Sequence, residues 1–185
     1  MKGVVITELL DMIERRHGIE VLDSVLTAAS PVPDTAYRLD GTYDWREFAA
    51  LVAALGSATG LAGKSLLRGF GQHLFAVFAA RYPGLLAGVT SPLDLLADLE
   101  GCVYPEVLRQ FPDAELPRWA GQRSRQGLVL HYTSPRPFGD FALGLIEGCL
   151  LHYGTPAQIR VDGEGGDIRF TISLRQEERC PTSTR

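Results

Sequence analysis

The sequence of 185 residues is poor in cysteine, which occurs only at the widely separated positions Cys102, Cys149 and Cys180. The number is odd and no CxxC pair occurs, so neither a disulfide framework nor a zinc knuckle is expected. Isolated cysteines of this kind are usually small core residues or solvent-facing thiols. The cysteines therefore predict no site of their own.

Long apolar runs and basic runs are missing as well. No apolar run reaches the roughly 18 residues that a membrane-spanning helix needs, and the start MKGVVITELLDMIERR is too charged and too short for a signal peptide. The net charge is −4 and no Lys/Arg-rich segment occurs, which argues against a surface that binds nucleic acid. We therefore expect a soluble, cytoplasmic protein that binds neither nucleic acid nor membrane.

The usual catalytic motifs are also missing. The sequence has no G-x-S-x-G, P-loop, HExxH or GxGxxG pattern. Glu106 and Glu115 are scattered carboxylates and do not form a recognisable acid/base pair. The sequence therefore predicts a binding or regulatory protein and not an enzyme.

What is present is the composition of an ordinary globular chain, with 45% hydrophobic and 22% charged residues. The length suits one domain with a substantial core. We predict a single domain over residues 1–175, followed by a polar tail over residues 176–185.

The first two-thirds of the chain has helical periodicity. Ser91 followed by Pro92 is typical of a helix start, and that helix is predicted to continue to about Glu100. The segment from Pro105 to Phe111 predicts one or two further helical turns. Apolar residues at three- and four-residue intervals predict earlier helices over residues 4–16, 19–29, 45–59 and 64–81.

The last third changes to a period of two. Residues 128–132 alternate as a strand does, and residues 158–162 and 168–174 flank a GEGG turn as a hairpin. Residues 138–153 return to helical spacing. The fold class that this order predicts is α+β: a helical part followed by a small antiparallel sheet with an inserted helix.

The strand LVLHYTSPRPFGDF carries side chains suited to an anion. Residues two apart share one face of a strand, so Tyr132, Ser134 and Arg136 project together if the extended geometry continues to residue 136. Two hydroxyls and a guanidinium suit a carboxylate or phosphate. Leu128 and Leu130 share the face, which favours an anion on a mostly apolar ligand. Taken alone, a strand that ends in this motif is more often a solvated sheet edge than a binding site.

This motif resembles the haem-propionate motif of the H-NOX (haem nitric oxide/oxygen binding, HNOB) domains. Other segments are similar to the family in the same order: the start MKG with its apolar helix, LLRGFGQHLFAVFAARYPGLL, PDAELPRW and HYTSPRPFGDFALGLIEGCLLHYG. Together they cover roughly residues 1–175. The resemblance implies the H-NOX fold and a haem cofactor whose propionates are held by Tyr132, Ser134 and Arg136.

The resemblance also implies the lining of a haem pocket, by Leu9, Leu74, Phe78, Pro117 and Phe141. Oxygen-binding members carry a distal tyrosine with polar helpers, whereas the aligned positions Leu9, Leu74 and Phe141 are apolar here. The resemblance therefore implies a pocket of the NO type and not the O2 type. Some relatives bind zinc near the C-terminal hairpin, but VDGEGGDIRFTISL contains neither Cys nor His, so no zinc is expected.

The position that departs from the family is Tyr104, in LEGCVYPEVLRQF, where the family has its proximal histidine. A phenol must lose a proton to ligate iron and then prefers ferric iron, and the nearest candidate cation in the sequence is Arg109. Three alternatives remain at this stage. In the first, Tyr104 ligates ferric haem. In the second, Tyr104 packs beside an iron that is free or is ligated by another residue, for which His73 is the best candidate. In the third, the pocket is empty or binds another apolar acid.

For function, the resemblance implies a stand-alone haem-binding regulatory protein of the gas-sensor kind, with NO as the ligand. Its partner in trans would be a histidine kinase or a cyclic-dinucleotide enzyme. The alternative is an interaction module that keeps the fold without haem and binds a different apolar acid or none.

Overall fold

The computed structural model describes residues 1–29 and 37–175. The first part of the chain is helical, and the helices predicted there are confirmed to within about one residue at each end. They are α1 Gly3–His17, α2 Ile19–Ala29, α3 Trp45–Thr59 and α4 Gly63–Arg81. The predicted tail, 176–185, and part of the loop before α3, residues 30–36, lie outside the described residues.

A run of short helices follows α4: η1 Pro83–Leu86, α5 Pro92–Ala97, α6 Leu99–Cys102 and α7 Tyr104–Gln110. The prediction of one helix from Pro92 to about Glu100 is wrong, because the chain breaks at Asp98. Asp98 leaves helical geometry (φ −130°, ψ 47°), and its carboxylate accepts a hydrogen bond from the amide of Gly101 at 3.2 Å. This cap starts α6 in a new direction and leads the chain to Tyr104.

The last part of the chain forms a four-stranded antiparallel sheet of order β1-β2-β4-β3 with one inserted helix. Its elements are β1 Arg118–Ser124, β2 Gly127–Thr133, α8 Gly139–His152, β3 Ala157–Glu164 and β4 Asp167–Leu174. The α+β class is therefore confirmed. The sequence reading missed β1, because this edge strand, RWAGQRS, exposes nearly every side chain and lacks apolar alternation.

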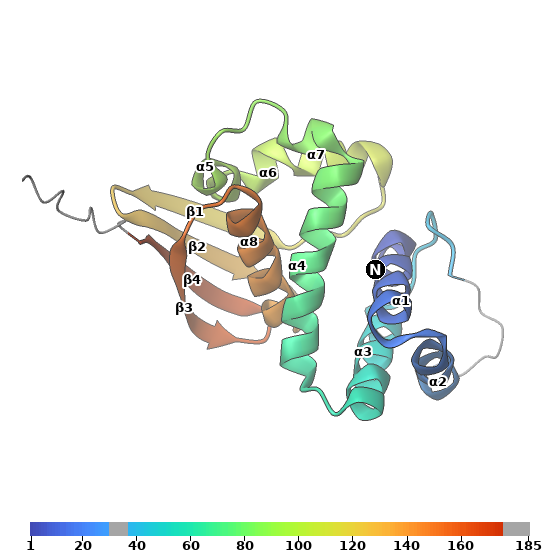
Figure 1. Cartoon of the computed structure of the whole chain (residues 1–185). Helices are drawn as coiled ribbons and strands as arrows, with labels where there is room; N and C mark the ends of the chain where they lie inside the picture. The colour runs from blue at the N-terminus through green and yellow to red at the C-terminus, as the bar shows by residue number, and fades with distance from the viewer. Residues whose placement is uncertain (30–36, 176–185) are drawn as a thin grey trace, which may run out of the picture.

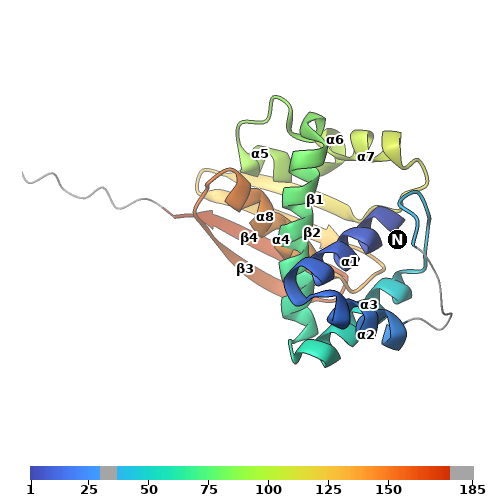
Figure 2. The same cartoon turned by 45° about the vertical axis from the view of Figure 1, so that its right-hand side comes forward.

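The two parts meet along α4 and α8. Figure 1 shows α8 lying on one face of the sheet, α4 standing beside α8, and α1–α3 on the far side of α4. Figure 2 shows the same order after a turn of 45° about the vertical axis. The helices approach closely at glycines: a Cβ at Gly144 of α8 would overlap the carbonyl of Arg68 on α4. The contact fixes the position of the sheet relative to the helices.

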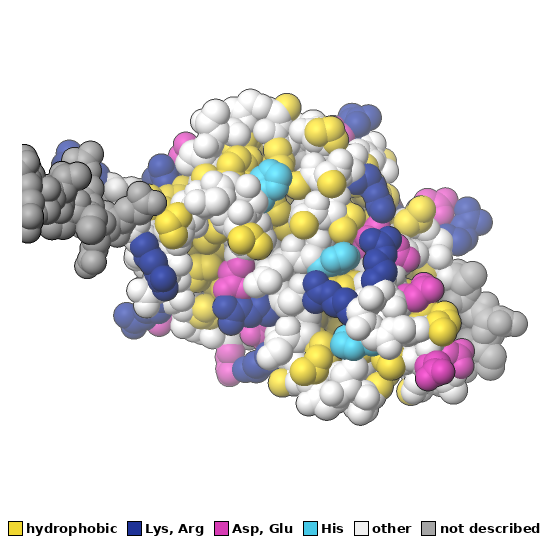
Figure 3. Space-filling model, in the orientation of Figure 1, with side chains coloured by type: hydrophobic (Ala, Val, Ile, Leu, Met, Phe, Trp, Pro, Cys, Tyr) yellow, Lys and Arg dark blue, Asp and Glu magenta, His cyan; other side chains and the backbone are white. Residues whose placement is uncertain are grey.

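Each part has its own core. Buried side chains of α1–α4, such as Ile13, Phe48 and Phe70, form one cluster, and those of α5, α8 and the inner sheet face form the other. Figure 3 shows basic and acidic side chains interspersed on the outside, on the face over α4 and α8. Within residues 1–29 and 37–175 no single helix is long and apolar enough to cross a membrane; α3 and α4 pass that test only together, bent by 114° at their junction.

Candidate functional site: a cavity between the helices and the sheet

A cavity of about 580 Å³ lies where α1, α4 and α8 meet α7 and the end of β2. Its volume is in the range of sites for organic ligands and cofactors. The wall that α1, α4 and α8 contribute is apolar, with Val5 from α1, Leu74 and Phe78 from α4, and Phe141 from α8. Polar side chains gather at the rim formed by the N-terminus, residues 113–115 and residues 134–136.

Tyr132, Ser134 and Arg136 all line this cavity, as their spacing suggested, but not through a continuous strand. β2 ends at Thr133, so the expectation of extended geometry up to residue 136 is wrong. The amide of Ser134 still donates to the carbonyl of Gly166 at 2.7 Å, and its hydroxyl accepts from the amide of Arg136 at 3.1 Å. This side-chain-to-backbone bond turns the chain and brings Arg136 to the cavity.

Gly166 is required at this turn. A Cβ on Gly166 would overlap the carbonyl oxygen of Ser134, so a larger residue would push the end of β2 away from the hairpin turn. The β3–β4 turn therefore supports the end of the cavity that Ser134 and Arg136 line, although it is remote in sequence. Nothing in the spacing of the strand residues predicted this support.

Arg136 is largely buried, with a side chain 15% exposed, and it forms an ion pair with the carboxylate of Glu115. Glu115 itself is 82% exposed. The amine of Met1, which donates to the carbonyl of Tyr43 at 2.7 Å, lies close enough for Arg136 to act on it. Burial first, and the charge of Arg136 next, lower the pKa of that amine.

A second cation lies at the same rim. Lys2 has a side chain 11% exposed, and its Nζ contacts the Asp113 carboxylate at 2.9 Å and the Thr42 hydroxyl at 2.7 Å. The hydroxyl of Thr42 in turn donates to Asp113 at 2.8 Å. Lys2 and Arg136 thus take their carboxylate partners, Asp113 and Glu115, from one short segment between α7 and β1.

Tyr132 is buried, and its ring packs on that of Trp119 with centroids 4.8 Å apart. Burial raises the pKa of its phenol, while a hydrogen bond with Ser134 and the charge of Arg136 act in the opposite direction. This tyrosine lies in a basic neighbourhood, where its hydroxyl can donate to an anion held by Arg136.

Tyr104 also lines the cavity, at the first residue of α7, but its surroundings differ. Its hydroxyl donates to the backbone carbonyl of Pro117. Burial raises the pKa of the phenol well above its ordinary value, and the charge of Glu100 acts in the same direction. Glu100 is fixed nearby by accepting a hydrogen bond from the amide of Trp119 at 2.9 Å.

Arg109, the cation that could have stabilised a phenolate at Tyr104, forms an ion pair with another residue. Arg109 is exposed, and its guanidinium pairs with Glu106 at 2.6 Å on the outside of α7. This pair lowers the pKa of the Glu106 carboxyl to about 2. Arg109 therefore serves Glu106 and supplies no charge that would favour a phenolate at Tyr104.

Of the pocket residues that the resemblance implied, Leu74, Phe78, Pro117 and Phe141 line the cavity. Leu9 does not belong to the lining: it is 1% exposed in the helical core, and α1 contributes Val4 and Val5 to the wall. His73 is likewise outside the lining; its ring stacks on Phe70 with centroids 6.4 Å apart. Sequence reasoning missed Glu115, Lys2 and Trp119, whose roles arise only from tertiary neighbours.

The cavity fits some parts of a haem group and not others. The apolar wall suits a flat macrocycle, and the basic rim suits two carboxylates. The iron has no comparable partner, because no histidine or cysteine lines the cavity in the part of the chain that the structure describes. Nor do three His, Cys, Asp or Glu side chains approach one another closely enough there to hold a metal ion.

Fold and cavity together define an α+β domain with a largely apolar cavity, polar at its rim, between a helical part and a sheet. The Haem-NO-binding (HNOB) family model matches residues 2–161. The chain therefore belongs to the H-NOX family of haem-based gas sensors, and the expected family is confirmed. None of the curated proteins compared with the chain matches it.

Solved H-NOX structures agree with this assignment. The H-NOX protein from K. algicida, in its Fe(II) unliganded state, is 32% identical, with a TM-score of 0.89 over 97% of this chain and 100% of its own. The IWP-051-bound H-NOX from Shewanella woodyi is 29% identical, with a TM-score of 0.83 over the whole of both chains. The H-NOX protein from S. oneidensis in the Fe(II)NO state, 24% identical with a TM-score of 0.88 over 95% of this chain and 100% of its own, shares the fold.

Proposed function

We propose that this chain is a haem-binding regulatory domain with a pocket of the NO type, which reports the state of its cavity to a partner protein in trans. The observation that carries the proposal is the position of Arg136, a largely buried guanidinium at the rim of an otherwise apolar cavity. A buried arginine of this kind suits a carboxylate on an apolar ligand, because its fork binds two oxygens at once.

The geometry of the cavity supports a binding role for each of these residues. Arg136, Ser134 and Tyr132 would hold the propionates of the cofactor, and Leu74, Phe78, Pro117 and Phe141 would contact its ring. The cofactor, when bound, supplies an iron centre for a diatomic gas. The chain's own part is to enclose the ring, neutralise its carboxylates and exclude water from one face.

Support for NO over O2 comes from the wall opposite α7. The residues of α1, α4 and α8 that line the cavity include Val5, Leu74 and Phe141, whose side chains cannot donate a hydrogen bond. Bound O2 depends on such a donor for much of its stabilisation, and NO depends on it far less. The proposal assigns no catalytic reaction to the domain, and it places the protein in the cytoplasm with a histidine kinase or a cyclic-dinucleotide enzyme as the partner.

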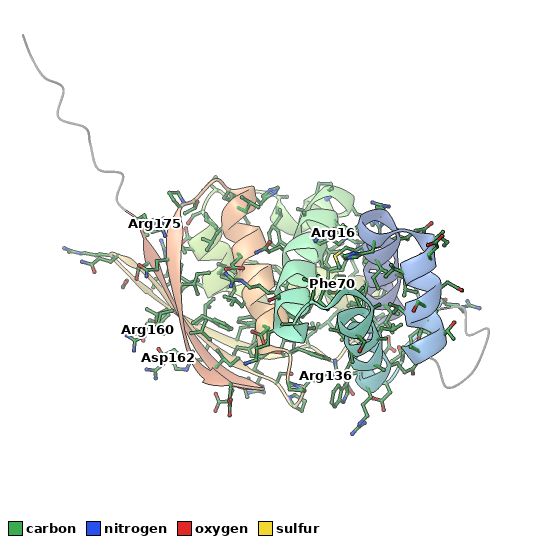
Figure 4. All side chains as sticks on the ribbon, turned by 60° about the horizontal axis from the view of Figure 1, so that its bottom comes forward. Arg16, Phe70, Arg136, Arg160, Asp162 and Arg175 are labelled. Atoms are coloured by element: carbon green, nitrogen blue, oxygen red, sulfur yellow. The ribbon has the colours of Figure 1, made fainter. Side chains whose placement is uncertain are left out.

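The test is a titration of the purified chain with hemin, followed by absorbance in the Soret region. The expected result is binding of one equivalent, which Arg136→Ala weakens by about tenfold or more, since a hydrogen bond to a charged group contributes about 1.5–3 kcal/mol. Arg160→Ala is the matched control, because Arg160 is 78% exposed and pairs with Asp162 on the edge strand β3. Figure 4 shows this pair at the sheet edge, far from Arg136.

Absence of hemin binding by the folded chain would refute the proposal, as would an equal loss in the two arginine variants. The gas preference is tested on the reduced, hemin-loaded chain: a stable complex is expected with NO and none with O2. A long-lived O2 complex would contradict the NO-type assignment.

A second function is favoured by Tyr104, whose hydroxyl is bonded to Pro117 where the family has its iron ligand. In that case the chain is an interaction module that keeps the H-NOX fold and its cavity without haem. The same titration separates the two functions, because only the first requires a porphyrin to bind.

A further inference from the structure

We propose that the cavity recognises a flat tetrapyrrole dicarboxylate by its ring and its two carboxylates alone, so that metal-free and metal-bearing porphyrins bind alike and no protein side chain bonds to the central metal. This inference rests on the proposed function and names the ligand class of the same site. It follows from three features of the cavity: the aromatic wall, the paired cations and the bonding of Tyr104.

The aromatic wall supplies contacts that do not depend on a metal. Trp119 and Tyr132 pack together on the sheet side of the cavity, and Phe78 and Phe141 line its helical side. A flat ring between these side chains gains dispersion and loses contact with water over both faces. These contributions are the same for a porphyrin with or without iron.

The paired cations supply two positions for carboxylates. Arg136 and Lys2 have side chains 15% and 11% exposed, and both lie at the cavity rim. Their present partners, Glu115 and Asp113, are two residues apart in one segment. The segment thus places two carboxylates beside two cations at one edge of an apolar cavity, an arrangement that a ligand with two carboxylates on one edge can reproduce.

The exchange of carboxylates is inexpensive for the protein. Glu115 is 82% exposed and Asp113 is 62% exposed, so either carboxylate can return to water when a ligand replaces it. Each carboxylate that leaves is replaced by a carboxylate of the ligand, so the largely buried cation stays paired. The side chains of Lys2 and Arg136, by contrast, are largely buried, so both cations stay at the cavity rim when a ligand binds.

The bonding of Tyr104 excludes its use as an axial ligand in this arrangement. The hydroxyl proton is donated to the carbonyl of Pro117, a backbone group that the chain fixes in place. The carboxylate of Glu100 acts on the phenol and opposes loss of that proton, and Arg109 is already paired with Glu106. Tyr104 therefore does not serve as a metal ligand, and its hydrogen bond to Pro117 instead fixes the segment that leads into β1.

The experiment compares hemin, zinc protoporphyrin IX and metal-free protoporphyrin IX on the purified full chain. Both tryptophans, Trp45 and Trp119, line the cavity, so quenching of their fluorescence reports binding of all three ligands. The expected dissociation constants agree within about threefold, and the dimethyl ester of protoporphyrin IX binds about tenfold more weakly because its carboxylates are blocked. Tyr104→Phe is expected to leave the ratio of hemin to metal-free affinity unchanged.

Each outcome decides between the two proposals. Hemin binding about tenfold or more tightly than metal-free protoporphyrin, or a hemin preference that Tyr104→Phe removes, would overturn this inference and leave the proposed haem function standing. No binding of any porphyrin would overturn both. Binding that Arg136→Ala and Arg160→Ala weaken equally would show adsorption outside the cavity and overturn both. Equal binding of the diester would overturn the inference alone, because the carboxylates would then not be recognised. Circular dichroism of each variant establishes that it is folded.

Discussion

Two of the tyrosines that line the cavity, Tyr104 and Tyr132, have neighbours that carry charges of opposite sign. Tyr132 is bonded to Ser134 and lies within the influence of Arg136, whereas Tyr104 donates to the Pro117 carbonyl and lies near the carboxylate of Glu100. The same phenol therefore has two different uses. In a basic neighbourhood it can help to bind an anion, and beside an acidic group it remains a neutral donor that fixes the backbone.

Replacing Tyr104 with histidine should produce the largest change. A neutral imidazole ligates haem iron without losing a proton, which a phenol cannot do. We expect Tyr104→His to bind hemin at least about tenfold more tightly than metal-free protoporphyrin IX, measured by the same fluorescence titration. If the variant has no preference for hemin, residue 104 does not face the centre of the ring, and the position of the family's iron ligand does not carry over to this cavity.

Removing each hydroxyl in turn separates binding from stability. Tyr132→Phe should weaken hemin binding by about threefold to tenfold, since one hydrogen-bond donor to the ligand is lost. Tyr104→Phe should instead lower Tm by about 2–4 °C, because the Pro117 carbonyl loses its partner at a cost of about 1 kcal/mol. Titration and thermal unfolding are measured on both variants, and a reversal of the two effects would contradict the comparison.

Removing the charge of Glu115, the counter-ion of Arg136, should have a smaller effect on hemin affinity and in the opposite direction. Glu115→Gln keeps the shape of the side chain and removes its charge, so a ligand carboxylate no longer competes with it for the guanidinium. We expect hemin to bind about threefold more tightly, because its carboxylate no longer has to displace the exposed carboxylate of Glu115 from Arg136. Asp162→Asn, which removes the partner of Arg160 on β3, is the matched control and should have no effect on binding. Weaker binding in Glu115→Gln would show that Glu115 supports the site instead of competing for it.

The sequence was sufficient for most of the fold because its periodicity reflects burial. The stripe in α3 runs through Phe48, Leu51, Val52 and Leu55, all buried, and it gave the bounds Trp45–Thr59 without error. β1 escaped detection because an edge strand with exposed faces needs no apolar alternation. The break at Asp98 depends on a side-chain cap that competes with a continuous helix, and spacing alone does not decide that competition.

The site was predictable only where neighbours in space are also neighbours in sequence. Tyr132, Ser134 and Arg136 were found from their spacing, although the turn after Thr133 and not the strand brings Arg136 to the cavity. The partners of Arg136 and Lys2 come from residues 113–115, and pairing of that kind follows from the tertiary fold. Leu9 and Val5 lie one turn apart on nearly the same face of α1, yet Val5 lines the cavity and Leu9 packs in the helical core, and the spacing of the two residues does not distinguish these positions.

The last and smallest expected effect concerns His73, the one histidine that sequence reasoning offered as an alternative to Tyr104. Its Nε2 is buried and makes no hydrogen bond within the described residues, and burial, followed by the charge of Arg16, lowers its pKa. A histidine whose folded-state pKa is depressed binds protons more weakly in the folded than in the unfolded chain. Stability therefore falls as pH decreases through the ordinary histidine value of about 6.5.

We expect Tm to decrease slightly between pH 7 and pH 5, and His73→Gln to reduce that decrease. His131→Gln is the matched control, since His131 is exposed on the outer face of the sheet. Hemin affinity should be the same for both variants, because His73 packs on Phe70 outside the cavity lining. If His73→Gln instead abolishes a hemin preference over metal-free protoporphyrin, His73 reaches the metal in the bound state, and the contrast between the two tyrosines no longer explains how this cavity selects its ligand.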